Sequence, residues 1–223
     1  TVPDKFRFDG QSVKLTWKNT RTHGSISITK TDGNQPLSGA FFGLYKDAAA
    51  AEEPIDIQQT DKNGKALFAD LEAGKYYVKE IAAPNGYVLD ETIRPFTIGG
   101  NDAWDVKTNI ENSLKQYTLK LTKKGDDGKL LQGVEFTLSG NGISSITKSS
   151  DEDGVVTFTG LAFGEYTITE VEAPQGYVKA KPINVTIDEK NTVGAYTPNQ
   201  AVDGGTITNE HTVLTVLKID DAD

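Results

Sequence analysis

Apolar and polar residues alternate along many short stretches of this chain. Ile26 and Ile28 form one such row and Tyr76 and Val78 another, within runs rich in Thr, Val and Tyr. Apolar side chains at every second position are typical of strands with one buried face. Only residues 48–53 have a locally helical pattern. The sequence therefore predicts an all-β protein built from short strands and turns.

One pattern occurs twice in the chain. The segment TDKNGKALFADLEAGKYYVKEIAAPNGYVL begins at Thr60 and aligns without a gap with SDEDGVVTFTGLAFGEYTITEVEAPQGYVK, which begins at Ser150. A fixed internal repeat is the mark of a tandem architecture, and 223 residues are enough for two domains. We predict two tandem β-sandwich domains over residues 21–113 and 114–211.

Both ends of the sequence resemble pieces of further copies. Residues 1–20 alternate from Val13 onwards and finish at Asn19, in the way that each full copy finishes on an Asn. Residues 212–223 repeat the opening of a copy, with an apolar row that starts at Leu214. We interpret the first segment as the end of a preceding repeat and the second as the start of a further repeat or a tail.

Composition excludes several classes of function. The net charge of −9 disfavours nucleic acid and anionic lipid as partners. No apolar run is long enough to span a membrane, so no membrane insertion of this segment is expected. Without cysteine the chain forms neither disulfides nor thiolate metal sites. We predict no cofactor and no bound metal.

Three polar residues in each copy continue an apolar row and are therefore expected to point into the core. An isolated ammonium or carboxylate is costly to bury, so a buried Lys and Glu are expected to pair or to exchange a proton. The alternative for each lysine is a strand-end side chain that reaches solvent. The six residues are Lys30, Glu80 and Asn112 in the first copy and Lys123, Glu170 and Asn209 in the second.

A neutral lysine amine is a nucleophile, so the three polar residues of each copy could react with one another. If the Asn carboxamide lies within reach, the amine can attack its carbonyl carbon while the Glu carries protons to the departing ammonia. The product would be a Lys-Asn isopeptide bond between the first and last strands of the domain. A crosslink of this loop length would stabilise the domain by about 4 kcal/mol if the loop-entropy account of disulfides applies.

The repeated motif resembles the B-type repeat domain of the collagen adhesin Cna, which Gram-positive adhesins and pilins share. The matching features are a Thr-Lys pair near the first strand, Y-x-(V/I)-x-E-x-x-A-P-x-G-Y in the middle, and an Asn on the final strand. The resemblance implies two immunoglobulin-like (prealbumin or Cna B-type) β-sandwiches on an extracellular, cell wall-attached protein. It also implies roles: Lys30 and Lys123 as bond amines, Asn112 and Asn209 as bond carboxamides, and Glu80 and Glu170 as catalytic carboxylates. The sequence shows no LPxTG-like sorting signal and no pilin-type Y-P-K-N segment.

Two functions fit this sequence. The first is a structural stalk or pilin segment whose partners are neighbouring repeats of the same surface protein. The alternative is an adhesin module that binds host extracellular matrix or carbohydrate through exposed loops at residues 48–57 and 141–147. An enzyme with turnover is disfavoured, because the only convergent polar set points into the core.

Other polar and aromatic residues have simpler interpretations. Residues 61–64 and 151–154 place oxygen side chains before Gly, which fits hairpin turns better than a calcium loop. His23 and His211 have no partner at metal-ligand spacing and are expected at the surface or in linkers. Trp104 is expected to pack rather than to bind sugar, although its polar surroundings would permit exposure.

Overall fold

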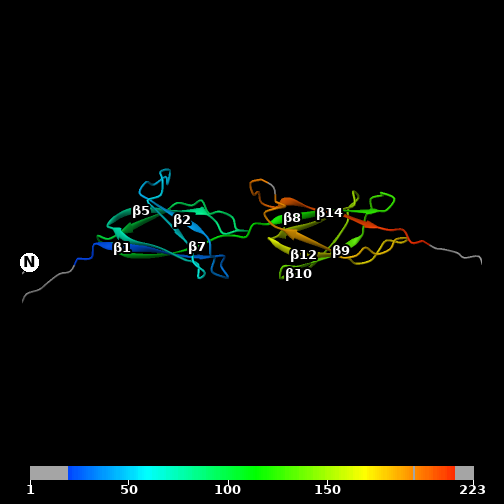
Figure 1. The fold of residues 1–223 in the computed structure, drawn as a ribbon, viewed down its shortest axis with the longest axis horizontal. Helices are drawn as coiled ribbons and strands as arrows, with labels where there is room; N and C mark the ends of the chain where they lie inside the picture. The colour runs from blue at the N-terminus through cyan, green and yellow to red at the C-terminus, as the bar shows by residue number, and fades with distance from the viewer. Residues whose placement is uncertain (1–19, 193, 214–223) are drawn as a thin grey trace, which may run out of the picture.

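The computed structural model describes residues 20–192 and 194–213. Every regular element in these residues is a strand, and the strands form two β-sandwiches placed one after the other along the molecule (Figure 1). The first sandwich contains β1 (His23–Thr31), β2 (Phe41–Tyr45), β3 (Asp56–Gln59), β4 (Lys65–Glu72), β5 (Gly74–Ala82), β6 (Arg94–Ile98) and β7 (Asp105–Glu111). The second contains β8 (Tyr117–Gly125), β9 (Glu135–Gly140), β10 (Ile143–Ser149), β11 (Val155–Leu161), β12 (Gly164–Glu170), β13 (Ile183–Ile187) and β14 (Gln200–Asn209). The predicted tandem all-β architecture is confirmed.

Some sequence-based expectations fall on the ends of the chain. The strand fragments expected between Val13 and Asn19 and from Leu214 onwards lie outside the described residues. In the ranges that are described, no helix is long and apolar enough to cross a membrane.

Each sandwich packs a three-stranded sheet against a four-stranded sheet. The strand orders are β4-β1-β7 and β3-β2-β5-β6 in the first sandwich, and β11-β8-β14 and β10-β9-β12-β13 in the second. The pairs β1–β7 and β8–β14, which join the first strand of a sandwich to its last, are parallel, whereas the other paired strands are antiparallel. Because first and last strands run in the same direction, the chain enters each sandwich at one end and leaves at the other (Figure 1).

Strand periodicity builds the core between the two sheets. Along β1 the side chains alternate between buried and half-buried, so that Ile26, Ile28 and Lys30 all face inward. In the same core lie Phe68 of β4 and Val78 of β5, both without solvent exposure. Burying an aliphatic or aromatic side chain of this size contributes roughly 1.5–3 kcal/mol. The second sandwich repeats this arrangement with its own apolar cluster.

The two Asp-rich segments form tight turns, but not hairpins. The Oδ1 atom of Asp61 accepts hydrogen bonds from the backbone N–H groups of Asn63 and Lys65, both at 2.8 Å. The turn joins β3 of one sheet to β4 of the other sheet, so the hairpin prediction is wrong. Asp151 makes the corresponding bonds between β10 and β11. Each turn therefore carries the chain across the sandwich.

The expected helical segment is also absent from the first sandwich. Residues 46–49 form bends and a turn, in which Oδ1 of Asp47 accepts the N–H groups of Ala49 and Ala51. A short Asp side chain that captures nearby backbone donors competes with helix formation. Ala50 then adopts a left-handed φ of 46°. A right-handed helix cannot continue through that residue.

Only parts of the two expected adhesive loops are loops. Strand β3 begins at Asp56 and pairs with β2, and strand β10 begins at Ile143 and pairs with β9. Residues 48–57 and 141–147 therefore each include the beginning of an edge strand of a four-stranded sheet. The polar and apolar residues in these two strands alternate over too few positions to predict an edge strand from the sequence.

Backbone hydrogen bonds fix the connection between the two sandwiches. Val88 donates its N–H to the carbonyl of Ser113 at 2.9 Å, and Lys115 donates to the carbonyl of Gly86 at 2.8 Å. The connection thus lies as a short strand-like segment against the loop that follows β5.

Aromatic side chains of the second sandwich pack at this junction. The ring of Tyr117 stacks on Phe163 with centroids 5.2 Å apart, and the edge of Tyr196 approaches Tyr117 at 5.6 Å. Gly86 of the first sandwich lies directly against Phe163, because a Cβ added at Gly86 would lie 3.4 Å from its ring. The junction is therefore a packed contact between the two sandwiches.

Gly64 is expected to be intolerant of any side chain. Its φ of 69° is left-handed, and an added Cβ would lie 2.3 Å from the carbonyl oxygen of Lys30. We expect Gly64→Ala to lower the free energy of unfolding of the first sandwich by about 2 kcal/mol or more, as measured by urea denaturation. Gly33→Ala is the matched control, because Gly33 also has a positive φ but has open space around its Cβ position. Equal losses in the two variants would show that the contact with Lys30 is unimportant.

Candidate functional site: two buried Lys-Glu-Asn clusters

The structure brings the three predicted polar residues of each copy together in the core. In the first sandwich Lys30 comes from β1, Glu80 from β5, and Asn112 directly follows β7. Their exposed fractions are 0%, 0% and 4%, so the solvent-facing alternative for Lys30 is wrong. The parallel pairing places Lys30 opposite Ile110, two residues before Asn112, and the N–H of Asn112 bonds the carbonyl of Thr31.

The asparagine lies between the lysine and the glutamate in the first cluster. Lys30 Nζ donates to Asn112 Oδ1 at 2.5 Å, and Asn112 Nδ2 donates to the two carboxylate oxygens of Glu80 at 2.9 and 3.0 Å. The direct distance from Lys30 Nζ to Glu80 Oε1 is 3.7 Å. The amine therefore touches the carbonyl side of the carboxamide, and the carboxylate touches its nitrogen side.

The second sandwich reproduces this geometry. Lys123 Nζ donates to Asn209 Oδ1, and Asn209 Nδ2 donates to Glu170 Oε1 at 2.9 Å. Lys123 Nζ lies 3.6 Å from Glu170 Oε1, and both side chains are fully buried. The two domains therefore share one arrangement of these three groups.

Burial shifts the protonation equilibria towards neutral groups. Removal from water lowers the pKa of the Lys30 amine, and the nearby Glu80 carboxylate only partly opposes this effect. Desolvation likewise raises the pKa of Glu80, against the hydrogen bonds from Asp90 and Asn112 and the charge of Lys30. The pKa of Lys123 is lowered for the same reason as that of Lys30. A neutral amine in contact with a carboxamide is a nucleophile placed at an electrophile.

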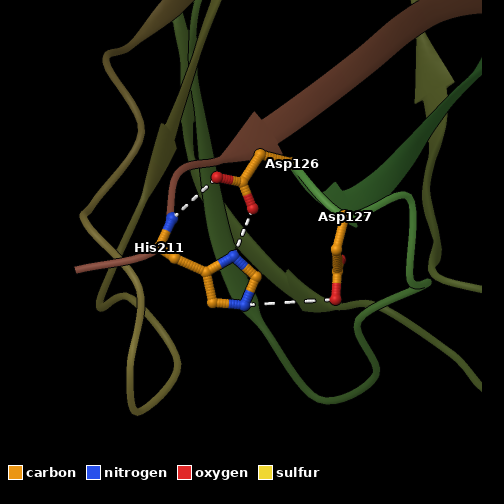
Figure 2. A group of neighbouring side chains, drawn as sticks. All are labelled: Asp126, Asp127 and His211. Carbon is orange, nitrogen blue, oxygen red and sulfur yellow. Dashed lines mark hydrogen bonds and ion pairs between the residues drawn. The ribbon is translucent and has the colours of Figure 1, made fainter. Parts of the chain in front are cut away.

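A different group of residues, which the sequence interpretation missed, has the composition of a metal site. Among the described residues, Asp126, Asp127 and His211 bring ligand atoms within 4.8 Å of one another. Figure 2 shows the His211 ring between the two carboxylates, with Nδ1 directed at Asp126 and Nε2 at Asp127. The distance from Nε2 to the Asp127 carboxylate is 4.0 Å. The three side chains are nearly half exposed. Because both ring nitrogens face carboxylates, contacts among the three side chains account for their arrangement.

The remaining predicted residues take structural roles. His23 is exposed at the start of β1. Trp104 packs against the core of the first sandwich, where its ring lies over Gly99. The packing interpretation of Trp104 is confirmed.

Comparison with known families identifies the fold. A sequence profile of the SpaA family, described as a prealbumin-like fold domain, matches residues 24–114 and 117–201. The chain belongs to this SpaA family of prealbumin-like domains. The resemblance to Cna B-type domains is thereby confirmed, and so is the fold class.

Relatives of these prealbumin-like domains occur in proteins of a streptococcus and a staphylococcus. The trypsin-resistant surface T6 protein of Streptococcus pyogenes is 34% identical over 116 residues, which cover 50% of this chain and 20% of that protein. Serine-aspartate repeat-containing protein F of Staphylococcus epidermidis is 29% identical over 187 residues, which cover 74% of this chain and 10% of that protein. This chain therefore spans a fifth or less of the length of these two relatives.

A solved structure supports the same arrangement of domains. The TIE protein of Bacillus anthracis superposes with a TM-score of 0.67 and 26% sequence identity, covering 85% of this chain and 34% of that one. The superposition extends over both sandwiches, so the tandem arrangement as well as the single-domain fold has a counterpart among known structures.

Replacement of His211 by Leu tests the electrostatics of the exposed cluster. The backbone N–H of His211 and then its ring hold the pKa of Asp126 below the usual value. We expect His211→Leu to raise the pKa of Asp126 while leaving it depressed, because the backbone donor remains. A depressed folded-state pKa adds stability above the unfolded-state value, and this stability is lost as the pH falls through the folded-state pKa. Carboxyl NMR titration measures the change, and an unaltered Asp126 titration would contradict this account.

Proposed function

We propose that this chain is a structural stalk segment of a Gram-positive surface protein, and that each domain forms its own Lys-Asn isopeptide bond. The observation that carries the proposal is the contact of a fully buried lysine amine with the carboxamide oxygen of an asparagine in both domains. The streptococcal surface protein among the relatives supports the proposed extracellular, wall-linked location.

The geometry suits a condensation that needs no outside reagent. The neutral amine of Lys30 attacks Cγ of Asn112, and the C–N bond to Nδ2 breaks as ammonia departs. Glu80 holds Nδ2, so it is placed to donate a proton to that leaving nitrogen and to take one back from Nζ. One amine and one carboxamide give one secondary amide and one ammonia, and Glu80 returns to its initial protonation state. In the second domain Lys123, Asn209 and Glu170 take the same roles.

The bond would remove an electrostatic cost from the core. A secondary amide is neutral, whereas an ammonium and a carboxylate without exposure are expensive to bury. The crosslink would also close a loop between residues that are 82 positions apart in the first domain. On the loop-entropy account this contributes about 4 kcal/mol to the stability of each domain.

The proposed chemistry is a single self-modification with no turnover. Each reacting group belongs to the chain, and the residues of the two clusters are at most 4% exposed, which leaves no opening for a substrate. Neighbouring repeats of the same surface protein remain the proposed partners, because this chain itself carries two copies of one domain in tandem. An adhesive role through residues 48–57 and 141–147 is the alternative, and binding to matrix proteins or glycan arrays would test it.

Intact-mass measurement tests the central claim directly. We expect the purified chain to be lighter than its sequence mass by two ammonia molecules, because each domain loses one. Tryptic peptides containing Lys30 and Lys123 should be recovered joined to those containing Asn112 and Asn209. A mass equal to that of the unmodified sequence would refute the proposal.

Substitution of the glutamates should separate the two bonds. We expect Glu80→Ala to abolish only the first ammonia loss and Glu170→Ala only the second, because each Glu contacts only the Asn of its own domain. The uncrosslinked domain should lose about 4 kcal/mol of stability and be digested by trypsin before its neighbour. Glu111→Ala, at an exposed position next to Asn112, is the matched control and should keep both losses. Retention of both losses in either core variant would show that Glu is not the proton carrier.

A further inference from the structure

One hydrogen bond supports the glutamate from outside each Lys-Glu-Asn cluster. The N–H of Asp90 donates to Glu80 Oε2 at 2.8 Å, and the N–H of Ala180 donates to Glu170 Oε2 at 2.6 Å. In both domains the donor lies ten residues after the glutamate. The loop that follows β5 or β12 therefore folds back to hold the carboxylate in place.

The residue that supplies this N–H differs between the domains. In the first domain the Asp90 carboxylate accepts the N–H of Thr92 at 3.0 Å and a bond from Arg94 Nη2 at 2.6 Å. Arg94 Nη1 also donates to the carbonyl of Thr92 at 3.1 Å. The Asp90 and Arg94 side chains are 19% and 26% exposed, so this ion pair is largely shielded from solvent. Asp90, Thr92 and Arg94 thus form a closed set of bonds around one turn.

Among the described residues of the second domain, the corresponding positions form no such set. Ala180 has no side-chain acceptor, and Pro182 follows two residues later. Proline fixes its own φ and restricts the residue before it, so it stiffens a loop without side-chain bonds. The two domains therefore restrain the same backbone donor by different means.

We propose that Asp90, held by Arg94 and Thr92, is a positioning residue for bond formation in the first domain. It fixes the N–H that keeps Glu80 against the departing nitrogen of Asn112. The inference rests on the proposed isopeptide chemistry. Oε2 of Glu80 accepts from both Asp90 and Asn112, so a displaced Asp90 N–H would let the carboxyl group turn away from Nδ2. Small displacements of a group that transfers a proton lower reaction rates steeply.

Asp90 could instead act through its charge, and the two roles differ in their signatures. Burial is the main cause of the raised pKa of Glu80, and the Asp90 charge raises it slightly further. For Lys30, the Asp90 charge raises the pKa and the Arg94 charge lowers it. Asp90→Asn removes the charge and keeps one acceptor oxygen, which can still accept the N–H of Thr92, whereas the bond from Arg94 to the second oxygen is lost. Asp90→Ala removes the charge and the acceptor oxygens, and it introduces the residue that the second domain has at this position.

Bond formation in the second domain serves as an internal reference rate for the experiment. The full chain is made by cell-free translation at a series of pH values, and samples are quenched in acid denaturant over time. Digestion and mass spectrometry then measure the Lys30–Asn112 and Lys123–Asn209 crosslinked peptides in the same sample. The variants are Asp90→Ala, Asp90→Asn and Arg94→Ala, with Glu91→Ala as the matched control at an exposed position of the same loop.

We expect Asp90→Ala to slow the first bond roughly tenfold relative to the second bond. Arg94→Ala should slow it by a smaller factor, because the turn bond to Thr92 remains. Asp90→Asn should slow it by about as much as Arg94→Ala and leave the pH profile unchanged, because the turn bond to Thr92 remains and the bond to Arg94 is lost. Glu91→Ala should have no effect. Circular dichroism of each variant reports folding, and Arg94→Ala gives the test if Asp90→Ala does not fold.

Two outcomes would overturn the positioning role. Wild-type rates of the first bond in both Asp90→Ala and Arg94→Ala would show that the loop restraint is unimportant. An Asp90→Asn variant as slow as Asp90→Ala, with a displaced pH profile, would assign Asp90 an electrostatic role instead. If the wild-type chain loses no ammonia from either domain, the underlying isopeptide proposal fails as well. That failure is seen in the wild-type chain, whereas the first two outcomes are seen only in the variants.

Discussion

The burial of a lysine amine and a glutamate carboxyl group beside one carboxamide is the constraint on which each domain depends. An isolated charge in this position would cost several kcal/mol, so the core is stable only if the three groups satisfy one another. They come from the first strand, a central strand and the end of the last strand, and these strands must therefore hold their register closely. The parallel pairing of β1 with β7 and of β8 with β14 provides that register, because it sets each lysine two positions before its asparagine.

Much of the fold and of the site follows from local patterns in the sequence. Alternation of side chains gave the inward direction of Lys30 and Glu80, and the repeat showed that this direction recurs in the second copy. Other features depend on distances that no local pattern carries. Residues 61–64 have the composition of a hairpin turn, yet sheet membership is decided by strands far apart in sequence. His211 meets Asp126 across 85 positions, so the histidine seemed isolated when only its neighbours were considered.

The two domains are alike in their cores and differ at their surfaces and connections. After the first sandwich, Leu114 pairs with Tyr87, whereas at the corresponding point after the second sandwich His211 pairs with Tyr177. The supporting backbone bonds are nevertheless repeated, since Val178 donates to Glu210 and Thr212 donates to Gly176. The exit of the second domain thus keeps the backbone geometry of the inter-domain junction while exchanging an apolar side chain for a charged cluster.

The parallel arrangement of first and last strands has a mechanical consequence. A tensile load applied at the two ends of a domain would run along β1 and β7 in opposite directions, since the chain enters and leaves at opposite ends (Figure 1). Such a load shears the whole ladder of hydrogen bonds at once, whereas antiparallel terminal strands would unzip one bond at a time. A lysine-asparagine contact at the end of that ladder lies on the shortest path for the load. The topology alone thus makes each domain a stiff element in a chain under tension.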